Sequence, residues 1–266
     1  MRTLITGIAG FAGSHLADLL LAKGYEIYGT VLKGESLRNI DIIKDRINLY
    51  KCDIVDEERV NQVVKEVNPE RVCHLAAQSS AGKSFGNPKL TFEVNVLGTV
   101  NLLEALRKYC KKESLRILLV SSAEIYGVVA EKDLPISEEQ PLRPISPYAA
   151  SKVAADLIGY QYYQSYKLSI IRTRVFNHTG PRQREAFVCA SFAKQIAEIE
   201  KRLKEPVILV GNLEAQRDFT DVRDIVGHTG LQLRTVNREK SIIFVQENQG
   251  QYRVFLIPYF HLQILS

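Results

Sequence analysis

The chain has 266 residues, of which 45% are hydrophobic and 24% charged, values typical of a globular protein with a sizeable core. Its formal net charge of +5 is scattered, without a basic run interleaved with aromatics, which argues against nucleic acid and suits an anionic small molecule such as a phosphate ester. No apolar stretch approaches the ~18 residues that span a bilayer, the N-terminus is not a signal peptide, and the four cysteines lack metal-ligand spacing. We therefore expect a cytoplasmic protein without membrane or metal.

The first 24 residues predict a strand, a glycine turn and a helix. Residues 2–6 are strand-like, three glycines spaced G-x-x-G-x-x-G follow, and leucines at helical spacing continue to Gly24, where a C-terminal cap belongs. A dinucleotide site requires this order, because the glycines let the backbone approach a pyrophosphate and the helix N–H groups bind its charge. A plain tight turn is the alternative. The cofactor contacts that we expect here are Gly7, Gly10, Phe11, Ala12 and Gly13.

The second strand, residues 25–31, bears on the form of the cofactor. NAD sites in such folds often carry an acid at the end of this strand, whereas NADP sites have an arginine nearby. This chain has Thr30, Val31 and Lys33 at that place, followed by Arg38, and no carboxylate. The sequence therefore leaves both NAD and NADP open and slightly favours NADP.

Strands and helices alternate over the next residues. We predict strands at 47–52, 71–77 and 115–120 and helices at 56–67 and 88–109, an alternation that implies a doubly wound parallel α/β sheet of the Rossmann type. The long helix is predicted to be uninterrupted, with Phe92, Val96, Val100, Leu103 and Leu106 facing inward.

Several polar residues stand in or just after these strands, and one, Asn95, lies on the long helix. Asp53 either accepts a hydrogen bond from an adenine amino group or caps the turn, and Asn95 is either a cofactor contact or a structural hydrogen-bonding residue. His74, within an apolar strand, is predicted to be a packed core residue. Gln78 and Ser79 follow one strand and Ser122 and Glu124 another, at the carboxyl ends where ligands of open α/β sheets gather.

A helix that starts at Pro147 carries the predicted acid/base group. Ser146 is a preferred N-cap residue and Pro147 suits the first helical position. Tyr148 and Lys152 stand four residues apart, so they project from one face. We predict that the ammonium lowers the phenol pKa from its usual value near 10, which would let Tyr148 exchange a proton with a sugar or alcohol oxygen.

The pattern changes after the strand predicted at 168–174. Residues 176–183 form a polar loop, a helix is predicted at 186–204, and a short strand at 207–210. Arg182, Arg184 and Arg217 lie in or near loops, where guanidinium groups suit a diphosphate. We predict a cofactor-binding domain at residues 1–175 and a small substrate-binding lobe at 176–226 that returns to the sheet.

Five motifs together resemble the extended short-chain dehydrogenase/reductases that act on nucleotide sugars. They are Thr6-Gly7-x-x-Gly10-Phe11-x-Gly13, His74-Leu75-Ala76-Ala77, Ser121-Ser122-x-x-x-Tyr126-Gly127, Ser146-Pro147-Tyr148-x-x-x-Lys152 and Arg217-Asp218-Phe219-x-Asp221-Val222. Within that superfamily, Phe176-Asn177-His178-x-x-Pro181-Arg182 and Phe187-Val188 resemble GDP-mannose 4,6-dehydratases and GDP-4-keto-6-deoxymannose reductases. A homodimer or higher homo-oligomer is common in the family that these motifs resemble.

The resemblance implies roles for particular residues. Ser122, Tyr148 and Lys152 would be catalytic, and Glu124 matches the position where the dehydratases carry the carboxylate that takes the proton from sugar carbon 5. Gln78 and Ser79 would line the sugar pocket, and a GDP-linked sugar would contact Asn177, Arg182 and Arg217. A GDP-mannose 4,6-dehydratase is favoured; the 4-reductase, which uses NADPH, and an NAD-dependent 4-epimerase stay open. The further implied cofactor contacts are Asp53, Ile54, Leu75, Ala76, Ala77, Asn95, Tyr148 and Lys152.

From Gly227 onward the resemblance is expected to stop. The chain reads Gly227-His228-Thr229-Gly230, and then two apolar, strand-like runs at 241–245 and 252–260. Exposed runs of this kind favour aggregation. We predict that residues 227–266 are an atypical tail from a reading-frame error or truncation, with a terminal hairpin as the alternative.

Overall fold

A parallel sheet of seven strands forms the centre of the molecule. The computed structural model describes residues 1–111, 113, 115–213, 217–235, 239–244 and 263–265. The strand order is β3-β2-β1-β4-β5-β6-β10, and every neighbouring pair is parallel. This order confirms the doubly wound α/β fold. The strands are β1 (Arg2–Thr6), β2 (Glu26–Val31), β3 (Asn48–Lys51), β4 (Arg71–His74), β5 (Arg116–Val120), β6 (Ile170–Val175) and β10 (Glu239–Phe244).

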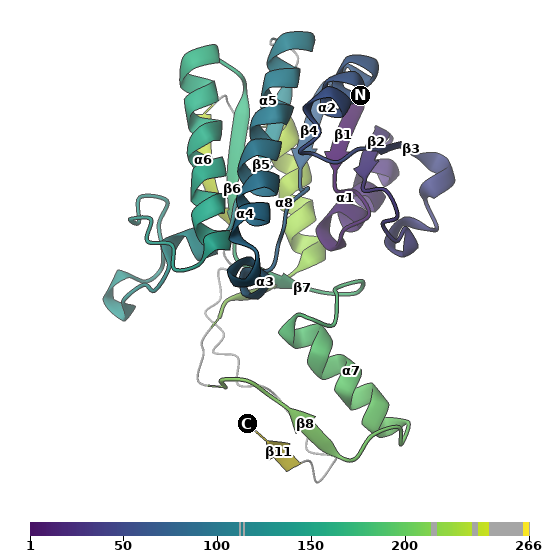
Figure 1. Cartoon of the computed structure of the whole chain (residues 1–266), viewed down its shortest axis with the longest axis vertical. Helices are drawn as coiled ribbons and strands as arrows, with labels where there is room; N and C mark the ends of the chain where they lie inside the picture. The colour runs from purple at the N-terminus through teal and green to yellow at the C-terminus, as the bar shows by residue number, and fades with distance from the viewer. Residues whose placement is uncertain (112, 114, 214–216, 236–238, 245–262, 266) are drawn as a thin grey trace.

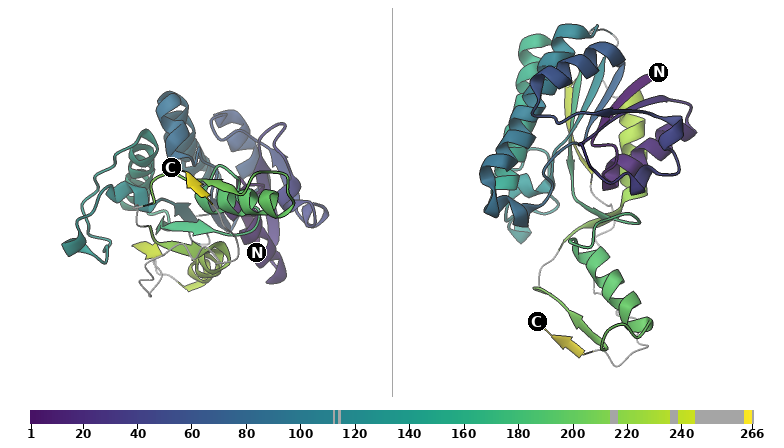
Figure 2. Two further views of the ribbon diagram at one scale, coloured as in Figure 1. Left: turned by 90° about the horizontal axis from the view of Figure 1, so that it is seen from below. Right: turned by 45° about the vertical axis from the view of Figure 1, so that its right-hand side comes forward.

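Helices cover both faces of the sheet, as Figures 1 and 2 show. On one side lie α2 (Glu57–Val67), α5 (Gly98–Tyr109) and α6 (Pro147–Tyr166); α1 (Phe11–Ala22) and α8 (Val222–Thr235) cover the other. Successive strand residues point to opposite faces, so Ile117 packs with the first group and Leu118 with the second. Both faces are therefore buried, which explains why the strands are apolar runs rather than alternating ones.

The long helix predicted at 88–109 is interrupted by one π turn. It comprises α4 (Pro88–Phe92), the π segment η3 (Glu93–Leu97) and α5. A π turn holds one extra residue, so it rotates the side chains that precede it relative to those that follow. Phe92, predicted to face inward, is therefore 40% exposed, whereas Asn95 is only 2% exposed. A buried amide thus occupies the inner side of this turn.

A small lobe lies at the end of the sheet where the strands finish (Figure 1). Strands β7 (Asn177–Thr179) and β9 (Phe219–Asp221) pair in parallel, as do β8 (Val207–Leu209) and β11 (Gln263–Leu265). Helix α7 (Val188–Glu200) lies between β7 and β8 in the chain. The remaining short elements are η1 (Arg38–Ile40), η2 (Lys44–Arg46), α3 (Ala81–Gly86), η4 (Ala123–Tyr126) and η5 (Glu131–Asp133).

The chain keeps regular structure beyond residue 226. Helix α8 runs through Gly227, and β10 pairs with β6 from Glu239 opposite Ile170 to Phe244 opposite Val175. The run 241–244 is thus the seventh strand of the sheet, whereas the run 252–260 lies outside the described residues. A reading-frame error or truncation stays a prediction. Among the residues described, none of the helices is long and apolar enough to cross a membrane.

Candidate cofactor and catalytic site

The glycine turn between β1 and α1 leaves no room for side chains. Gly7 has φ +69°, and a Cβ there would lie 3.0 Å from the Cα of Ala76. A Cβ at Gly13 would lie 2.5 Å from the Gly7 carbonyl oxygen. The N-cap of α1 is Gly10, which offers no side-chain hydrogen bond, and the first turn holds no acidic residue. The N-terminal N–H groups are thus left for an anion, so the turn fits the pyrophosphate of a dinucleotide.

Two threonine hydroxyls that the sequence analysis missed support this turn. Thr6 Oγ1 accepts hydrogen bonds from the backbone N–H groups of Leu75 (3.2 Å) and Ala76 (3.1 Å). Thr30 Oγ1 accepts one from Gly7 (3.3 Å). The sequence signal was a threonine in each of two strands beside the glycines. These bonds place Leu75 and Ala76 directly behind the glycine turn, and Ala77 follows them beyond the end of β4 at His74.

Residues that follow β3 and β2 make local contacts near the ends of these strands. Asp53 is exposed, and its Oδ1 accepts a hydrogen bond from the backbone N–H of Val55 (3.2 Å). Asp53 therefore caps the turn that follows β3. Its contact with adenine stays a prediction. Ile54 is buried, and a Cβ at Gly98 would lie 2.6 Å from its Cγ2. The Asn39 amide donates to the Ala9 carbonyl (3.0 Å), a support that the sequence analysis also missed.

Ser122 and Glu124, just after the end of β5, come close to Tyr148 at the start of α6. Helix α6 starts at Pro147, with Ser146 Oγ accepting from the Ala149 N–H (3.0 Å), as predicted. Ser122 is the N-cap of η4, and its Oγ accepts from the Glu124 N–H (3.2 Å). The Tyr148 phenol is hydrogen-bonded to Ser122 and lies within electrostatic reach of the Glu124 carboxylate. The Tyr148 phenol therefore lies close to both a hydroxyl and a carboxylate.

The protonation of Tyr148 differs from the prediction. Burial raises the pKa of Tyr148, the Ser122 hydrogen bond opposes that rise, and the Glu124 charge adds to it. Lys152 is 8% exposed, and its ammonium donates to the Val120 carbonyl. Burial lowers the pKa of Lys152 to about 8, while Asp156 acts in the opposite direction. The predicted lowering of the Tyr148 pKa is therefore wrong for this structure, because desolvation of the phenol outweighs the Ser122 hydrogen bond.

His74 belongs to the core, as predicted. Since Thr6 Oγ1 already accepts two N–H groups, its proton is left to donate to His74 Nδ1 (2.8 Å). The Nε2–H then donates to Thr99 Oγ1 (3.0 Å), which donates to the Asn95 carbonyl (2.7 Å). Burial lowers the pKa of His74 to about 3, and the Lys152 charge adds to this effect. His74 is therefore a neutral link between the glycine turn and the π segment.

The Asn95 side chain joins this segment to α6. Its Oδ1 accepts from the Gln78 N–H (2.8 Å), and its Nδ2 donates to the Gln78 carbonyl (3.1 Å) and to Ser151 Oγ (2.8 Å). Of the two roles considered from the sequence, a cofactor contact and structural hydrogen bonding, these bonds correspond to the structural one. The Gln78 amide donates to the Ser80 carbonyl (3.1 Å) and to Thr91 Oγ1 (3.2 Å), while Ser79 is exposed. Contact of Gln78 and Ser79 with a sugar stays a prediction.

The lobe contacts α1 through an ion pair, a ring stack and the hydrogen bond between the His15 ring and the Pro181 carbonyl (2.9 Å). Arg182 Nη1 lies 2.8 Å from Asp18 Oδ2, and the rings of Phe11 and His178 stack with centroids 5.6 Å apart. The structure thus places Arg182 against α1. Asn177 begins β7 opposite Phe219, and Arg217 is exposed two residues before β9. The described contacts do not bring these three predicted ligand contacts together.

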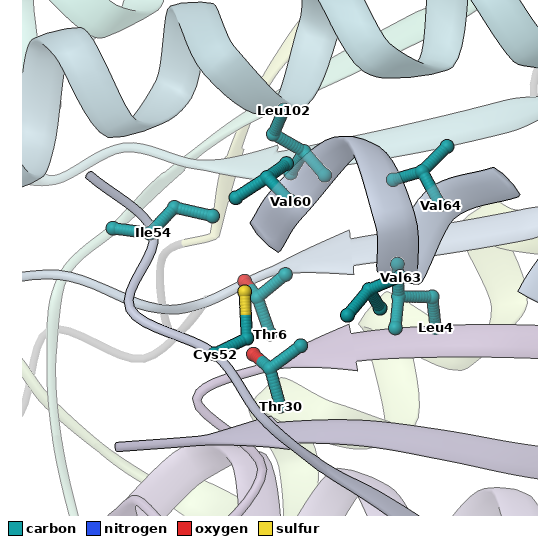
Figure 3. A pocket seen from close by; sticks show the side chains of 9 residues that line it. All are labelled: Leu4, Thr6, Thr30, Cys52, Ile54, Val60, Val63, Val64 and Leu102. Carbon is teal, nitrogen blue, oxygen red and sulfur yellow. The ribbon is translucent and has the colours of Figure 1, made fainter. Parts of the chain in front are cut away.

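A small cavity between the sheet and α2 is not the ligand site. Figure 3 shows it lined by Thr6, Thr30 and Cys52 on one side and by aliphatic side chains on the other. Its volume is about 10 Å³, scarcely enough for one water molecule. The Thr6 and Thr30 hydroxyls are already hydrogen-bonded in the turn. The remaining lining residues are Leu4, Ile54, Val60, Val63, Val64 and Leu102.

Known proteins are similar to this chain in sequence and in fold. A GDP-mannose 4,6-dehydratase of Vibrio cholerae is 34% identical over 251 residues, which are 91% of this chain and 67% of that protein. A GDP-6-deoxy-D-mannose reductase of Pseudomonas aeruginosa is 34% identical over 225 residues, 85% of this chain and 68% of that protein.

Solved structures extend the likeness to the whole chain. The structure of RMD from Pseudomonas aeruginosa complexed with NADPH has a TM-score of 0.84 at 30% identity and covers 100% of this chain and 85% of its own. A UDP-glucose 4-epimerase of Thermus thermophilus in complex with NAD has a TM-score of 0.81 at 34% identity and covers 93% of this chain and 78% of its own.

The family model described as GDP-mannose 4,6 dehydratase matches residues 4–256. The expectation that the resemblance stops at Gly227 is therefore wrong, because the match continues through α8 and β10. That expectation relied on local motifs, whereas the seventh strand is recognisable by its place in the sheet. The chain belongs to the GDP-mannose 4,6-dehydratase family and is an NAD(P)-dependent enzyme of nucleotide-sugar chemistry.

Proposed function

We propose that this protein is a GDP-mannose 4,6-dehydratase. The observation that carries the proposal is the half-buried Glu124 carboxylate beside Ser122 and Tyr148. Reduction or epimerisation at carbon 4 needs a proton shuttle for one oxygen, which Ser122 and Tyr148 supply. Dehydration also needs a base for the proton on carbon 5, and a positioned carboxylate can take that role.

Each residue then has one task. Tyr148 takes the proton of the carbon 4 hydroxyl while Ser122 hydrogen-bonds that oxygen. Glu124 removes the proton from carbon 5, made acidic by the carbon 4 ketone, and passes it to the carbon 6 hydroxyl, which leaves as water. Carbon 5 takes up a solvent proton when carbon 6 receives the hydride. Lys152, charged below about pH 8, favours the Tyr148 phenolate when it forms. Bound NAD(P) supplies the hydride acceptor at carbon 4, the hydride donor at carbon 6 and, when oxidised, a further positive charge near the phenol.

The binding roles follow from position. Asn177, at the start of β7, and Arg217, two residues before β9, are proposed to contact the GDP moiety. The exposed Ser79 is proposed to line the sugar pocket. Arg182 would reach GDP only by leaving Asp18. NADP is the favoured cofactor because Lys33 and Arg38 are exposed beyond the end of β2.

Assembly and location complete the proposal. Large apolar side chains are exposed on the packed pair α4 and α6, including Phe92 at 40%, Leu157 at 50% and Tyr160 at 44%. Such a face favours a homodimer through helix packing. All four cysteines are free thiols, which suits an enzyme of the reducing cytoplasm.

One observation favours a 4-reductase as the second candidate. Since burial raises the pKa of Tyr148, the phenol holds its proton at neutral pH and is ready to act as the general acid that ketone reduction needs. In that reaction Glu124 would not exchange a proton with the sugar. The two candidates therefore differ in their need for Glu124.

The test supplies GDP-mannose with a trace of NADP and no reductant. A dehydratase forms a 4-keto-6-deoxy sugar, whereas a reductase acts only on pre-made keto sugar with stoichiometric oxidation of NADPH. We expect Glu124→Gln to lower the dehydration rate by about 10²- to 10⁴-fold. The exposed Glu131→Gln serves as the control and should leave it unchanged. A full dehydration rate in Glu124→Gln would remove Glu124 from the mechanism.

A further inference from the structure

A buried ion network lies behind the catalytic residues. Asp156 stands one turn after Lys152 on α6, and its carboxylate is fully buried. Its Oδ1 accepts from Arg172 Nη1 (2.5 Å) and Arg174 Nη2 (3.2 Å), and its Oδ2 accepts from Arg174 Nε (3.2 Å). Both arginines come from β6. Helix α6 is thereby tied to the neighbouring strand by charged groups shielded from water.

Arg174 extends this network to the segment that carries Glu124. Its Nη1 donates to the Tyr126 hydroxyl (3.0 Å) and to the Glu138 carbonyl (2.7 Å). The guanidinium is a rigid planar fork, so bonds on its different edges fix their partners relative to one another. Arg174 therefore joins α6, the turn η4 and the loop 128–142 that Figure 1 shows beside the base of α6.

The turn η4 is too short to hold Glu124 independently of Tyr126. It has four residues, from Ala123 to Tyr126, and ends at Gly127, whose φ is +66°. A Cβ at Gly127 would lie 1.9 Å from the Arg143 carbonyl oxygen, so the backbone is tightly confined there. Tyr126 is 1% exposed, two residues after Glu124. A shift of the Tyr126 ring must therefore move the backbone that carries the carboxylate.

We propose that Tyr126 and Arg174 are positioning residues that hold Glu124 against Tyr148 for removal of the carbon 5 proton. The inference rests on the proposed dehydratase function, and it adds residues that do not touch the reacting atoms. Ser122 is the N-cap of η4, two residues after β5, and Tyr148 is the second residue of α6. Transfer of hydride at carbon 4 should therefore depend less on Tyr126 than the placement of the Glu124 carboxylate does. The two steps of the reaction should therefore respond differently to loss of the Tyr126 hydroxyl.

The test compares Tyr126→Phe with Tyr162→Phe. Both variants delete one tyrosine hydroxyl bonded to a charged side chain, but Tyr162 donates to Glu104 (2.7 Å), away from the site. Single turnovers with GDP-mannose in D₂O follow two readouts: transient reduction of bound NADP, and deuterium entering carbon 5. We expect Tyr126→Phe to slow the entry of deuterium at least about tenfold with unchanged cofactor reduction. Tyr162→Phe should change neither.

Arg174→Lys provides a second variant. It keeps a cation beside Asp156 but lacks the planar guanidinium that also binds Tyr126 and Glu138. It should show the same selective loss, with folding checked by thermal unfolding. Suppose that Glu124→Gln blocks the entry of deuterium. The inference would then be overturned if a folded Tyr126→Phe or Arg174→Lys enzyme slowed both readouts equally or slowed neither. Unchanged deuterium entry in Glu124→Gln would instead overturn the proposed function, and this inference with it.

Discussion

The sheet and the lobe at its carboxyl end are stabilised in different ways. Each face of the sheet carries an extended cluster of buried apolar side chains. Among the described residues of α7 and β8 in the lobe, only Gln195 and Ile208 are buried. Leu209 at the end of β8 is 58% exposed, and Leu203 in the loop between the two elements is 75% exposed. A few polar and aromatic contacts to α1 place the lobe. Changes in the sheet should therefore alter stability, whereas changes in the lobe should mainly alter substrate binding.

The largest expected effect is a loss of stability of the sheet at low pH, caused by the buried His74. The unfolded chain gains a proton on this group below its ordinary pKa of 6.5, but the folded chain does so only near 3. The free energy of unfolding therefore falls as the pH falls from 6.5 towards 3, by up to about 1.4 kcal/mol per pH unit. Urea unfolding at pH 7, 6 and 5 measures this slope.

His74→Gln removes this titrating group and should reduce the slope over that range, leaving the contribution of His178, whose pKa burial also lowers. Equal slopes in wild type and His74→Gln would show that His74 does not stay neutral in the folded protein.

The glycine turn, where the sheet half meets α1, should give the next largest effect. In Gly13→Ala the new methyl group would lie 2.5 Å from the Gly7 carbonyl oxygen, and such overpacking costs about 1–3 kcal/mol. We expect the affinity for NADPH, measured by fluorescence titration, to fall about 100-fold because the turn must open. Gly82→Ala, with no atom within 4 Å of its Cβ, should bind NADPH like the wild type. Wild-type affinity in Gly13→Ala would exclude the turn as the pyrophosphate site.

The ion pair between lobe and α1 should give the smallest effect on stability. Arg182 and Asp18 side chains are 28% and 36% exposed, and such pairs contribute about 0.2–1 kcal/mol. Arg182→Gln should leave the unfolding temperature nearly unchanged and raise the KM for GDP-mannose. Asp18→Asn distinguishes two explanations for the higher KM. If Arg182 acts by holding the lobe against α1, Asp18→Asn should raise the KM as well. An unchanged or lower KM in Asp18→Asn would instead mean that Arg182 binds the diphosphate directly.

Much of the site could be predicted because its signals are local. The strand, turn and helix of the first 24 residues follow from spacing, and the start of α6 follows from Ser146 and Pro147. Ser122 and Tyr148 could be expected to meet because their segments follow one another at the carboxyl end of a parallel sheet. The seventh strand was missed because β10 pairs with a strand about 70 residues earlier, so that its apolar run resembled an exposed tail.

The sequence by itself determined the order of strands and helices and the kinds of groups in the site, since periodicity, capping and glycine spacing act over a few residues. Only the tertiary structure decided that Asn95 turns inward and Phe92 outward, that burial raises the pKa of Tyr148, and that Arg174 joins Tyr126 to Asp156. Desolvation and hydrogen bonding between distant segments depend on which surfaces pack together. That packing is a property of the whole fold.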